Sequence, residues 1–269
     1  MSIFRDKLLD GKVAVVTGGG SGINLRIAER FAEHGARVAL VGRTQEKLDK
    51  AVAGIASRGG AAAGHAADVR DYAALSAVLQ KTRASLGEFD IVVCGAAGNF
   101  PAPVEGMSSN GFKAVVDIDL LGTFNTCRAA LEHLRTPGAS IISISATHAY
   151  VPTAYQAHVC AAKAGVDMLM RTLAIEWGPR KIRLNSIAPG PIAETEGMNR
   201  LTPTPELAAN LQAKVPLRRY GTKDEIADLA LFLSSDAAAF ITGAVVPCDG
   251  GQALVGSGIW GNAMEVGAR

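Results

Sequence analysis

The sequence predicts an α/β fold in which a doubly wound parallel sheet is flanked by helices. Apolar segments alternate with segments of helical periodicity along the chain. The apolar segments are short, rich in Val and Ile, and lack the apolar–polar alternation of a half-exposed strand. A glycine cluster separates the first apolar segment from the first helical one. Strands of this kind are buried on both faces, which is typical of parallel strands joined by helical crossovers.

The individual elements follow from these patterns in chain order. Strands are expected at the apolar runs Lys12–Thr17, Arg37–Gly42, Gly64–Ala67, Ile91–Cys94, Ser140–Ile144, Arg183–Ile187 and Ala244–Pro247. Helices are expected at the segments with helical spacing, Gly22–Gly35, Thr44–Ser57, Asp71–Leu86, Gly111–Leu134, Ala154–Trp177 and Lys223–Ser234. The strict alternation of the two kinds of element supports the parallel sheet.

Residues 190–220 are the least regular stretch of the chain. They contain four prolines, Pro191, Pro203, Pro205 and Pro216. No internal repeat, low-complexity tract or Pro/Gly-rich linker divides the sequence. We therefore expect a single domain spanning residues 1–269, with a mobile substrate flap at about 190–220.

Composition narrows the class of protein. Hydrophobic residues make up 48% of the chain, so a large core is feasible, and a net charge of +2 with 5% aromatic residues argues against a nucleic-acid partner. Neither a hydrophobic leader nor a run long enough to cross a bilayer is present, so we expect a cytoplasmic protein with no membrane partner. No spacing predicts a metal site, and the scattered cysteines indicate free thiols: Cys94, Cys127, Cys160 and Cys248.

The glycine cluster predicts a dinucleotide site. It follows the first strand and opens the first helix, so its backbone N–H groups can approach a pyrophosphate at the positive end of the helix. A plain strand-to-helix turn also uses glycine, but the position within a βαβ unit favours the nucleotide. The sheet is then of the Rossmann type. The residues assigned to the cofactor here are Gly18, Gly20, Ser21, Gly22, Ile23 and Asn24.

The end of the second strand predicts the choice of cofactor. An acidic residue there would bind the ribose 2′-hydroxyl of NAD, whereas this chain has Gly42. Arg43 and Thr44 can contact a 2′-phosphate by charge-assisted hydrogen bonds, although Arg43 also suits a solvated charge at the start of a helix. We therefore expect NADP(H).

Several segments resemble the short-chain dehydrogenase/reductase family, and within it the 2,4-dienoyl-CoA reductases of the peroxisomal branch and their bacterial relatives. The glycine loop is similar to the family motif TGxxxGxG, with Asn24 in place of the last glycine. Cys94–Phe100 resembles the branch segment NNAAGNF, with Cys94 and Gly95 in place of its two Asn residues. The resemblance runs from about Phe4 to Gly251 and includes Asp117–Asn125, Leu173–Pro179 and Pro189–Gly197.

The resemblance assigns the family's catalytic Asn, Ser, Tyr and Lys to Asp119, Ala146, Val159 and Lys163. The missing Ser and Tyr count against ketone reduction, which needs a hydroxyl pair to polarise and protonate the carbonyl oxygen. The peroxisomal branch lacks the Tyr in the same way and uses an Asp and the Lys, which hold a water as the acid. The resemblance therefore implies NADPH-dependent reduction of 2,4-dienoyl-CoA to 3-enoyl-CoA in unsaturated fatty acid oxidation. The resemblance also implies that Asp119 and Lys163 are the catalytic residues.

Other interpretations of these residues stay open. Asp119 also suits an anchor for the long helix, and Lys163 a contact to the nicotinamide ribose alone. His148 lies fifteen residues before Lys163, where the mitochondrial type of dienoyl-CoA reductase carries its Tyr. It is a third catalytic candidate, and equally an ordinary loop residue. The alternative functions are a 3-oxoacyl (ketone) reductase and a non-catalytic NADP-binding member of the family.

The resemblance also implies further binding residues and an assembly. The additional cofactor residues are Asp68, Val69, Ala96, Ala97, Gly98, Lys163, Pro189, Gly190, Ile192 and Thr195. The residues implied for an acyl-CoA substrate are Arg70, Phe100, Ser108, Ser109, Asn110 and Arg200. The family further implies a homotetramer packed through its long helices and its C-terminal segment.

Overall fold

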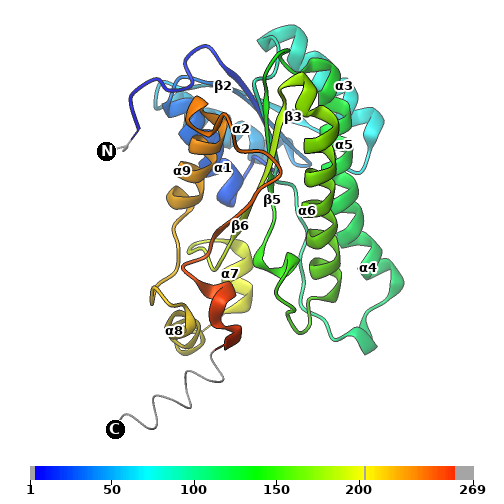
Figure 1. The fold of residues 1–269 in the computed structure, drawn as a ribbon, viewed down its shortest axis with the longest axis vertical. Coiled ribbons are helices and arrows are strands. Elements are labelled where there is room, and N and C mark those ends of the chain that lie inside the picture. The colour runs from blue at the N-terminus through cyan, green and yellow to red at the C-terminus, as the bar shows by residue number, and fades with distance from the viewer. Residues whose placement is uncertain (1–3, 203, 258–269) are drawn as a thin grey trace.

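The structure, a computed structural model that describes residues 4–202 and 204–257, contains one sheet of seven parallel strands (Figure 1). The strand order is β3-β2-β1-β4-β5-β6-β7, so the chain reverses its direction of travel across the sheet between β1 and β4. This is the doubly wound arrangement that the sequence predicts. The strands are β1 Val13–Thr17, β2 Arg37–Gly42, β3 Ala61–Ala66, β4 Ile91–Cys94, β5 Ser140–Ile144, β6 Arg183–Pro189 and β7 Val245–Cys248.

Helices cover both faces of the sheet (Figure 1). On β1, Ala14 and Val16 belong to the core formed with α1, α2 and α9, whereas Val13 and Val15 belong to the core formed with α3, α5 and α6. Successive side chains of a strand point to opposite faces, so a strand buried on both sides is apolar throughout. The helices are α1 Gly22–Glu33, α2 Gln45–Ala56, α3 Tyr72–Leu86, α4 Ser109–Val116, α5 Gly122–Ala130, α6 Ala157–Trp177, α7 Glu196–Leu201, α8 Pro205–Lys214 and α9 Lys223–Ser234.

The long helix expected over Gly111–Leu134 is not one regular α-helix. A π-helical turn, Asp117–Leu121, separates α4 from α5. A π turn inserts one extra residue and rotates the side chains that follow it. Because apolar residues continue on both sides of this turn, the periodicity of the sequence does not reveal it.

Residues 190–220 are more regular than the prolines indicate. Thr195 caps α7 by accepting a hydrogen bond from the N–H of Met198, and Thr204 caps α8 in the same way through Leu207. Pro205 stands in the first turn of α8, where its missing N–H has no partner to lose. Two short helices in this stretch were therefore missed from the sequence, whereas the role of the stretch as a mobile substrate flap stays a prediction. Pro205 stands at a helix start rather than at a break.

Several element boundaries also differ from the prediction, and three of them have a clear physical reason. The third strand begins at Ala61 instead of Gly64, because its Ala- and Gly-rich sequence carries little β-propensity and pairing with β2 fixes its length. α6 begins at Ala157 instead of Ala154, after Tyr155 takes a positive φ of 64°. β6 continues to Pro189 through its pairing with β7.

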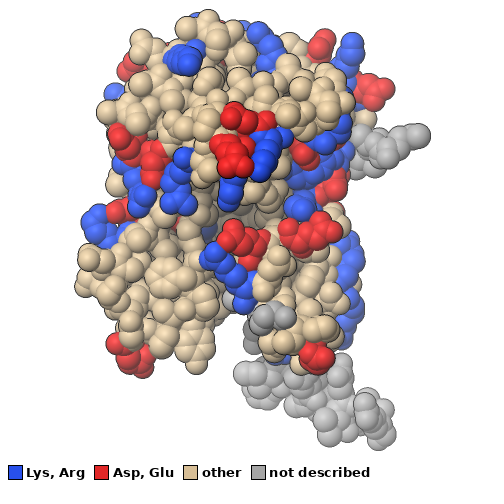
Figure 2. Space-filling view, turned by 180° about the vertical axis from the view of Figure 1, so that it is seen from behind, with Lys and Arg blue, Asp and Glu red and all other residues tan. Residues whose placement is uncertain are grey.

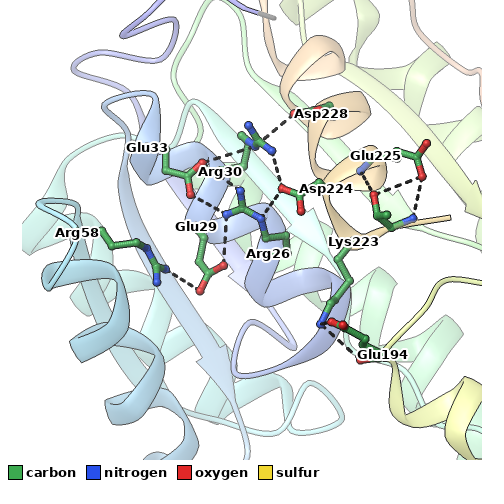
Figure 3. A network of polar contacts seen from close by, with 11 residues as sticks. Arg26, Glu29, Arg30, Glu33, Arg58, Glu194, Lys223, Asp224, Glu225 and Asp228 are labelled. Carbon is green, nitrogen blue, oxygen red and sulfur yellow. Dashed lines mark hydrogen bonds and ion pairs between the residues drawn. The ribbon is translucent and has the colours of Figure 1, made fainter. Parts of the chain in front are cut away.

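A network of ion pairs joins α1 to α9 on one side of the sheet (Figure 3). Arg26 and Arg30 of α1 both bond to Asp224 of α9, with N–O distances of 2.8 and 2.6 Å. Arg30 also pairs with Asp228 at 3.2 Å, and Glu33 accepts from Arg26 at 2.7 Å. The network fixes the start of α9 against α1, the helix that follows the glycine loop.

The surface and helix lengths bear on the expected partners. Basic and acidic side chains are intermingled on the face shown in Figure 2. Among the described residues, no helix is both long enough and apolar enough to span a bilayer.

Candidate active site

Two adjoining cavities open where the parallel strands end. The first has a volume of about 400 Å³ and the second of about 590 Å³. Four residues line both cavities: Ile23, Ala97, Ile144 and Thr195. The first cavity lies at the reversal of strand order between β1 and β4, which is where open α/β sheets bind their ligands.

The glycine loop forms one wall of the first cavity. Its N-cap residue Ser21 forms no capping hydrogen bond with its side chain, and the first turn of α1 contains no acidic residue, both within the described part of the chain. The N–H groups of this turn are therefore available to an anion. Gly18 has a φ of 69°, and an added Cβ would come within 3.0 Å of the Ala96 backbone. The wall thus fits a pyrophosphate group, which needs both the close backbone approach and the positive helix end.

The far end of the first cavity carries two cations. Arg43 and Lys47 line it beside Thr44, and Gly42 leaves space next to them. Asp68 lies at the same end and pairs with Arg70 at 2.6 Å. Hydrogen bonds from Arg70, with a smaller effect of the Arg43 charge, lower the pKa of Asp68. Lys47 was not predicted as a site residue, although a cation in the first turn of α2, close in sequence to Arg43, is a usable signal.

A buried ion pair lies in the second cavity. The ammonium group of Lys163 is 3.1 Å from Oδ2 of Asp119, and their side chains are 8% and 1% exposed. Lys163 also donates to the carbonyl oxygen of Ile144 at 2.9 Å. Oδ1 of Asp119 accepts from the backbone N–H of Gly98 at 2.7 Å. The pair therefore joins α6, the end of β5 and the loop after β4.

The π turn brings Asp119 into this position. Asp119 lies at the middle of Asp117–Leu121, where the helix departs from regular α geometry. Thr123 donates to the Asp119 carbonyl oxygen at 2.6 Å, which leaves the carboxylate to Gly98 and Lys163. The sequence assigned Asp119 to the site by resemblance, whereas the turn that directs it is a feature of the structure alone.

The cavity that holds the ion pair is apolar at two important positions. Ala146 and Val159 both line the second cavity, and Val159 is only 4% exposed. His148, in the single turn Thr147–Ala149, lines the same cavity. Burial lowers the pKa of its imidazole, and the positive charge of Lys163 lowers that pKa further. Both effects favour the neutral imidazole, which has one N–H to donate.

Every residue that the sequence assigned to the cofactor lines one of these two cavities. Those from the glycine loop, β2 and β3 surround the first cavity, together with Ala96 and Ala97. Gly98, Lys163, Pro189, Gly190 and Ile192 line the second, and Thr195 lines both. Strand ends far apart in the sequence therefore meet as the parallel sheet requires.

None of the six residues assigned to the acyl-CoA lines either of the two cavities that the described residues form. Ser108 caps α4 through the N–H of Gly111, and Ser109 and Asn110 are exposed in the first turn of that helix. The Phe100 ring packs on His158 with centroids 4.4 Å apart. Arg70 pairs with Asp68, and Arg200 bonds to Glu196 and to the Asn99 carbonyl. Their contacts with substrate stay predictions.

Helix α8 supplies a wall that the sequence did not assign to the site. Leu207, Asn210, Leu211 and Lys214 line the second cavity, with Gln252 and Ala253 from the segment after β7. Their spacing of three and four residues is the available signal for one helical face. It was missed because the prolines around α8 indicated an irregular segment.

Comparisons with known proteins agree with this arrangement. A family model described as enoyl-(acyl carrier protein) reductase matches residues 18–253. The peroxisomal 2,4-dienoyl-CoA reductase ((3E)-enoyl-CoA-producing) of Arabidopsis thaliana is 45% identical, over 93% of this chain and 87% of its own. The probable 2,4-dienoyl-CoA reductase ((2E)-enoyl-CoA-producing) of Bacillus subtilis strain 168 is 41% identical, over 91% and 98%. A gluconate 5-dehydrogenase from Burkholderia cenocepacia J2315, solved in complex with NADP and tartrate, is similar with a TM-score of 0.86 and 32% identity, covering 92% and 97%.

Proposed function

The chain belongs to the short-chain dehydrogenase/reductase family, and we propose that it reduces 2,4-dienoyl-CoA to 3-enoyl-CoA with NADPH. One observation carries the proposal: the ion pair of Asp119 and Lys163 is buried in a cavity that has alkyl side chains at Ala146 and Val159. Those are the positions of the family's carbonyl-protonating hydroxyls. The site thus suits a substrate whose proton goes to carbon. The names of both dienoyl-CoA reductase relatives agree with an acyl-CoA substrate.

The first cavity, which the glycine loop borders, is called the nucleotide cavity from here on. It is suited to a nicotinamide cofactor, which supplies a hydride when bound. Arg43 and Lys47 would face a 2′-phosphate, and Gly42 removes the carboxylate that would select NAD. The relative solved with NADP supports a nicotinamide cofactor in this fold. NADPH is therefore the cofactor that we propose.

The ion pair stabilises the charge that reduction creates. When C5 of the diene is reduced, negative charge spreads over the thioester oxygen, C2 and C4. The Lys163 ammonium lowers the energy of this enolate, because it is buried and is held in place by Asp119 and the Ile144 carbonyl. A water held between Asp119 and Lys163 would deliver the proton to carbon. His148 can hydrogen-bond to this water or to the thioester oxygen through its neutral imidazole.

The site of protonation determines the product. A proton added to C2 leaves the double bond at C3, whereas a proton added to C4 leaves it at C2. The two dienoyl-CoA reductase relatives are named for different products, (3E) for the plant protein and (2E) for the bacterial one. The plant relative shares more of its sequence with this chain, so we propose the C2 proton and the 3-enoyl product.

We propose a homotetramer with its interface on the long helices. Four large apolar side chains of the π turn, α5 and α6 are exposed: Leu121, Phe124, Met168 and Ile175. Ile175 is 80% exposed, a large cost in water that a partner subunit would remove. The part of the C-terminal segment at 258–269 lies outside the described residues.

The decisive experiment follows NADPH absorbance with a medium-chain 2,4-dienoyl-CoA, with NADH and acetoacetyl-CoA as controls. We expect consumption of NADPH with the dienoyl-CoA alone. Deuterium should enter at C2 of the product when the reaction runs in heavy water, and deuterium at C4 would instead assign the 2-enoyl product. Reduction of acetoacetyl-CoA would favour the 3-oxoacyl reductase. NADPH binding without turnover of either substrate would favour the non-catalytic alternative.

A further inference from the structure

Asn24 and Gly95 are two departures from the family pattern that lie 71 residues apart in the chain. Asn24 replaces the last glycine of the nucleotide loop, and Gly95 replaces an Asn after β4. Taken singly, each weakens the resemblance. In the structure Asn24, in the first turn of α1, is in direct contact with Gly95, which follows β4.

The contact is a hydrogen bond with a close steric fit. Nδ2 of Asn24 donates to the carbonyl oxygen of Gly95 at 2.7 Å. A Cβ added to Gly95 would lie 2.2 Å from Oδ1 and 2.4 Å from Cγ of Asn24. Such distances do not occur between unbonded atoms, so a side chain at 95 and the Asn24 amide exclude one another. The Asn24 amide occupies the space into which residue 95 would otherwise project its side chain.

Gly95 is also held by a residue of β1. The N–H of Gly95 donates to Oγ1 of Thr17 at 3.1 Å, and Thr17 donates to the carbonyl of Val93 at 3.2 Å. Both peptide groups of Gly95 are therefore fixed, one by β1 and one by α1. Ala96 and Ala97 follow directly and line the nucleotide cavity. The next residue, Gly98, donates its N–H to Asp119.

We propose that Asn24 and Gly95 are a compensating pair of positioning residues, in which the amide of Asn24 replaces a side chain at 95. It fixes Ala96–Gly98 and thereby sets both the floor of the nucleotide cavity and the N–H that orients Asp119. The inference rests on the proposed function for the identity of the nucleotide. The pair explains why the glycine loop tolerates Asn at a position that usually packs tightly against the sheet.

The test is a double-mutant cycle of Asn24→Gly, Gly95→Asn and the two combined. NADPH affinity is measured by fluorescence titration, and the melting temperature is measured without cofactor. Gly95→Asn should lower the melting temperature clearly and weaken NADPH binding by about tenfold or more, because its side chain overlaps Asn24. Asn24→Gly should weaken binding several-fold, because the Gly95 carbonyl loses its partner. The double variant should return to within about threefold of the original affinity.

One control variant and one substitute variant keep the cycle decisive. Gly54→Asn makes the same exchange where an added Cβ meets no described atom within 4 Å, and it should leave NADPH affinity unchanged. If Gly95→Asn does not fold, Gly95→Ala with and without Asn24→Gly completes the same cycle. A double variant whose losses are the product of the two single losses would overturn the pairing. If the original protein binds neither NADPH nor NADH, the proposed function fails, while the melting temperatures still decide the pairing.

Discussion

The two adjoining cavities differ in what forms their essential contacts. The nucleotide cavity is formed largely by the backbone of a glycine loop, by strand ends and by the start of a helix. The second cavity depends on two buried side chains, Asp119 and Lys163, that come from different helical segments. A site made of backbone should tolerate side-chain changes and respond to changes in backbone freedom. A site made of two side chains should lose its chemistry when either one is changed.

The largest effect should come from Asp119→Asn. The amide keeps an oxygen for the Gly98 N–H but removes the negative charge facing Lys163. We expect kcat for dienoyl-CoA reduction to fall by about 10²- to 10⁴-fold, as for loss of a general acid–base group, with NADPH affinity nearly unchanged. Steady-state kinetics and a fluorescence titration measure the two quantities. Asp117→Asn, in the same π turn but paired with exposed Lys113, is the control. A similar loss in both variants would contradict the assignment.

Gly18→Ala should give the next largest effect, this time in the nucleotide cavity. The residue has a φ of 69°, and the new Cβ would press on the Ala96 backbone. We expect NADPH binding to weaken by about tenfold or more, with kcat at saturating cofactor reduced far less. Gly59→Ala is the matched control, because Gly59 also has a positive φ, of 81°, but an added Cβ meets no described atom within 4 Å. Equal loss of affinity in both would show that only stability had changed.

Arg43→Ala tests the side-chain part of the nucleotide cavity. Loss of one charge-assisted contact should raise KM for NADPH by about tenfold and leave KM for NADH nearly constant. Lys50→Ala removes an exposed cation from α2, the helix that follows Arg43, and should change neither value. An equal rise of both KM values in Arg43→Ala would argue against a 2′-phosphate contact.

The smallest effect should come from His148→Leu. Burial and the Lys163 charge hold the pKa of His148 below its usual 6.5. The folded protein therefore binds a proton at this residue more weakly than the unfolded chain does. Stability from this residue is therefore present above about pH 6.5 and decreases as the pH falls below that value. The variant should show a smaller drop in melting temperature between pH 7.5 and about pH 5.5, and kcat reduced by about tenfold at most. A loss of kcat as large as that of Asp119→Asn would make His148 the proton donor.

Local patterns were sufficient for most of the fold. The buried strands are apolar throughout because both of their faces are covered, and this feature appears directly in the sequence. The glycine loop also depends on local chemistry, since the turn between β1 and α1 requires a positive φ at Gly18. Short segments with weak signals were less predictable. β3 was placed late and α7 and α8 were missed, because their Ala, Gly and Pro content is ambiguous without neighbours.

Local patterns in the chain were enough to specify the doubly wound sheet and the glycine loop that borders the nucleotide cavity. Both follow from glycine content, from apolar periodicity and from the alternation of strands and helices, which can be recognised within short segments of sequence. Tertiary structure decided the rest of the site. It placed the π turn that directs Asp119 to Lys163, the α8 wall of the second cavity, and the contact between Asn24 and Gly95. These features depend on packing between residues far apart in the chain, and local periodicity contains no record of such contacts.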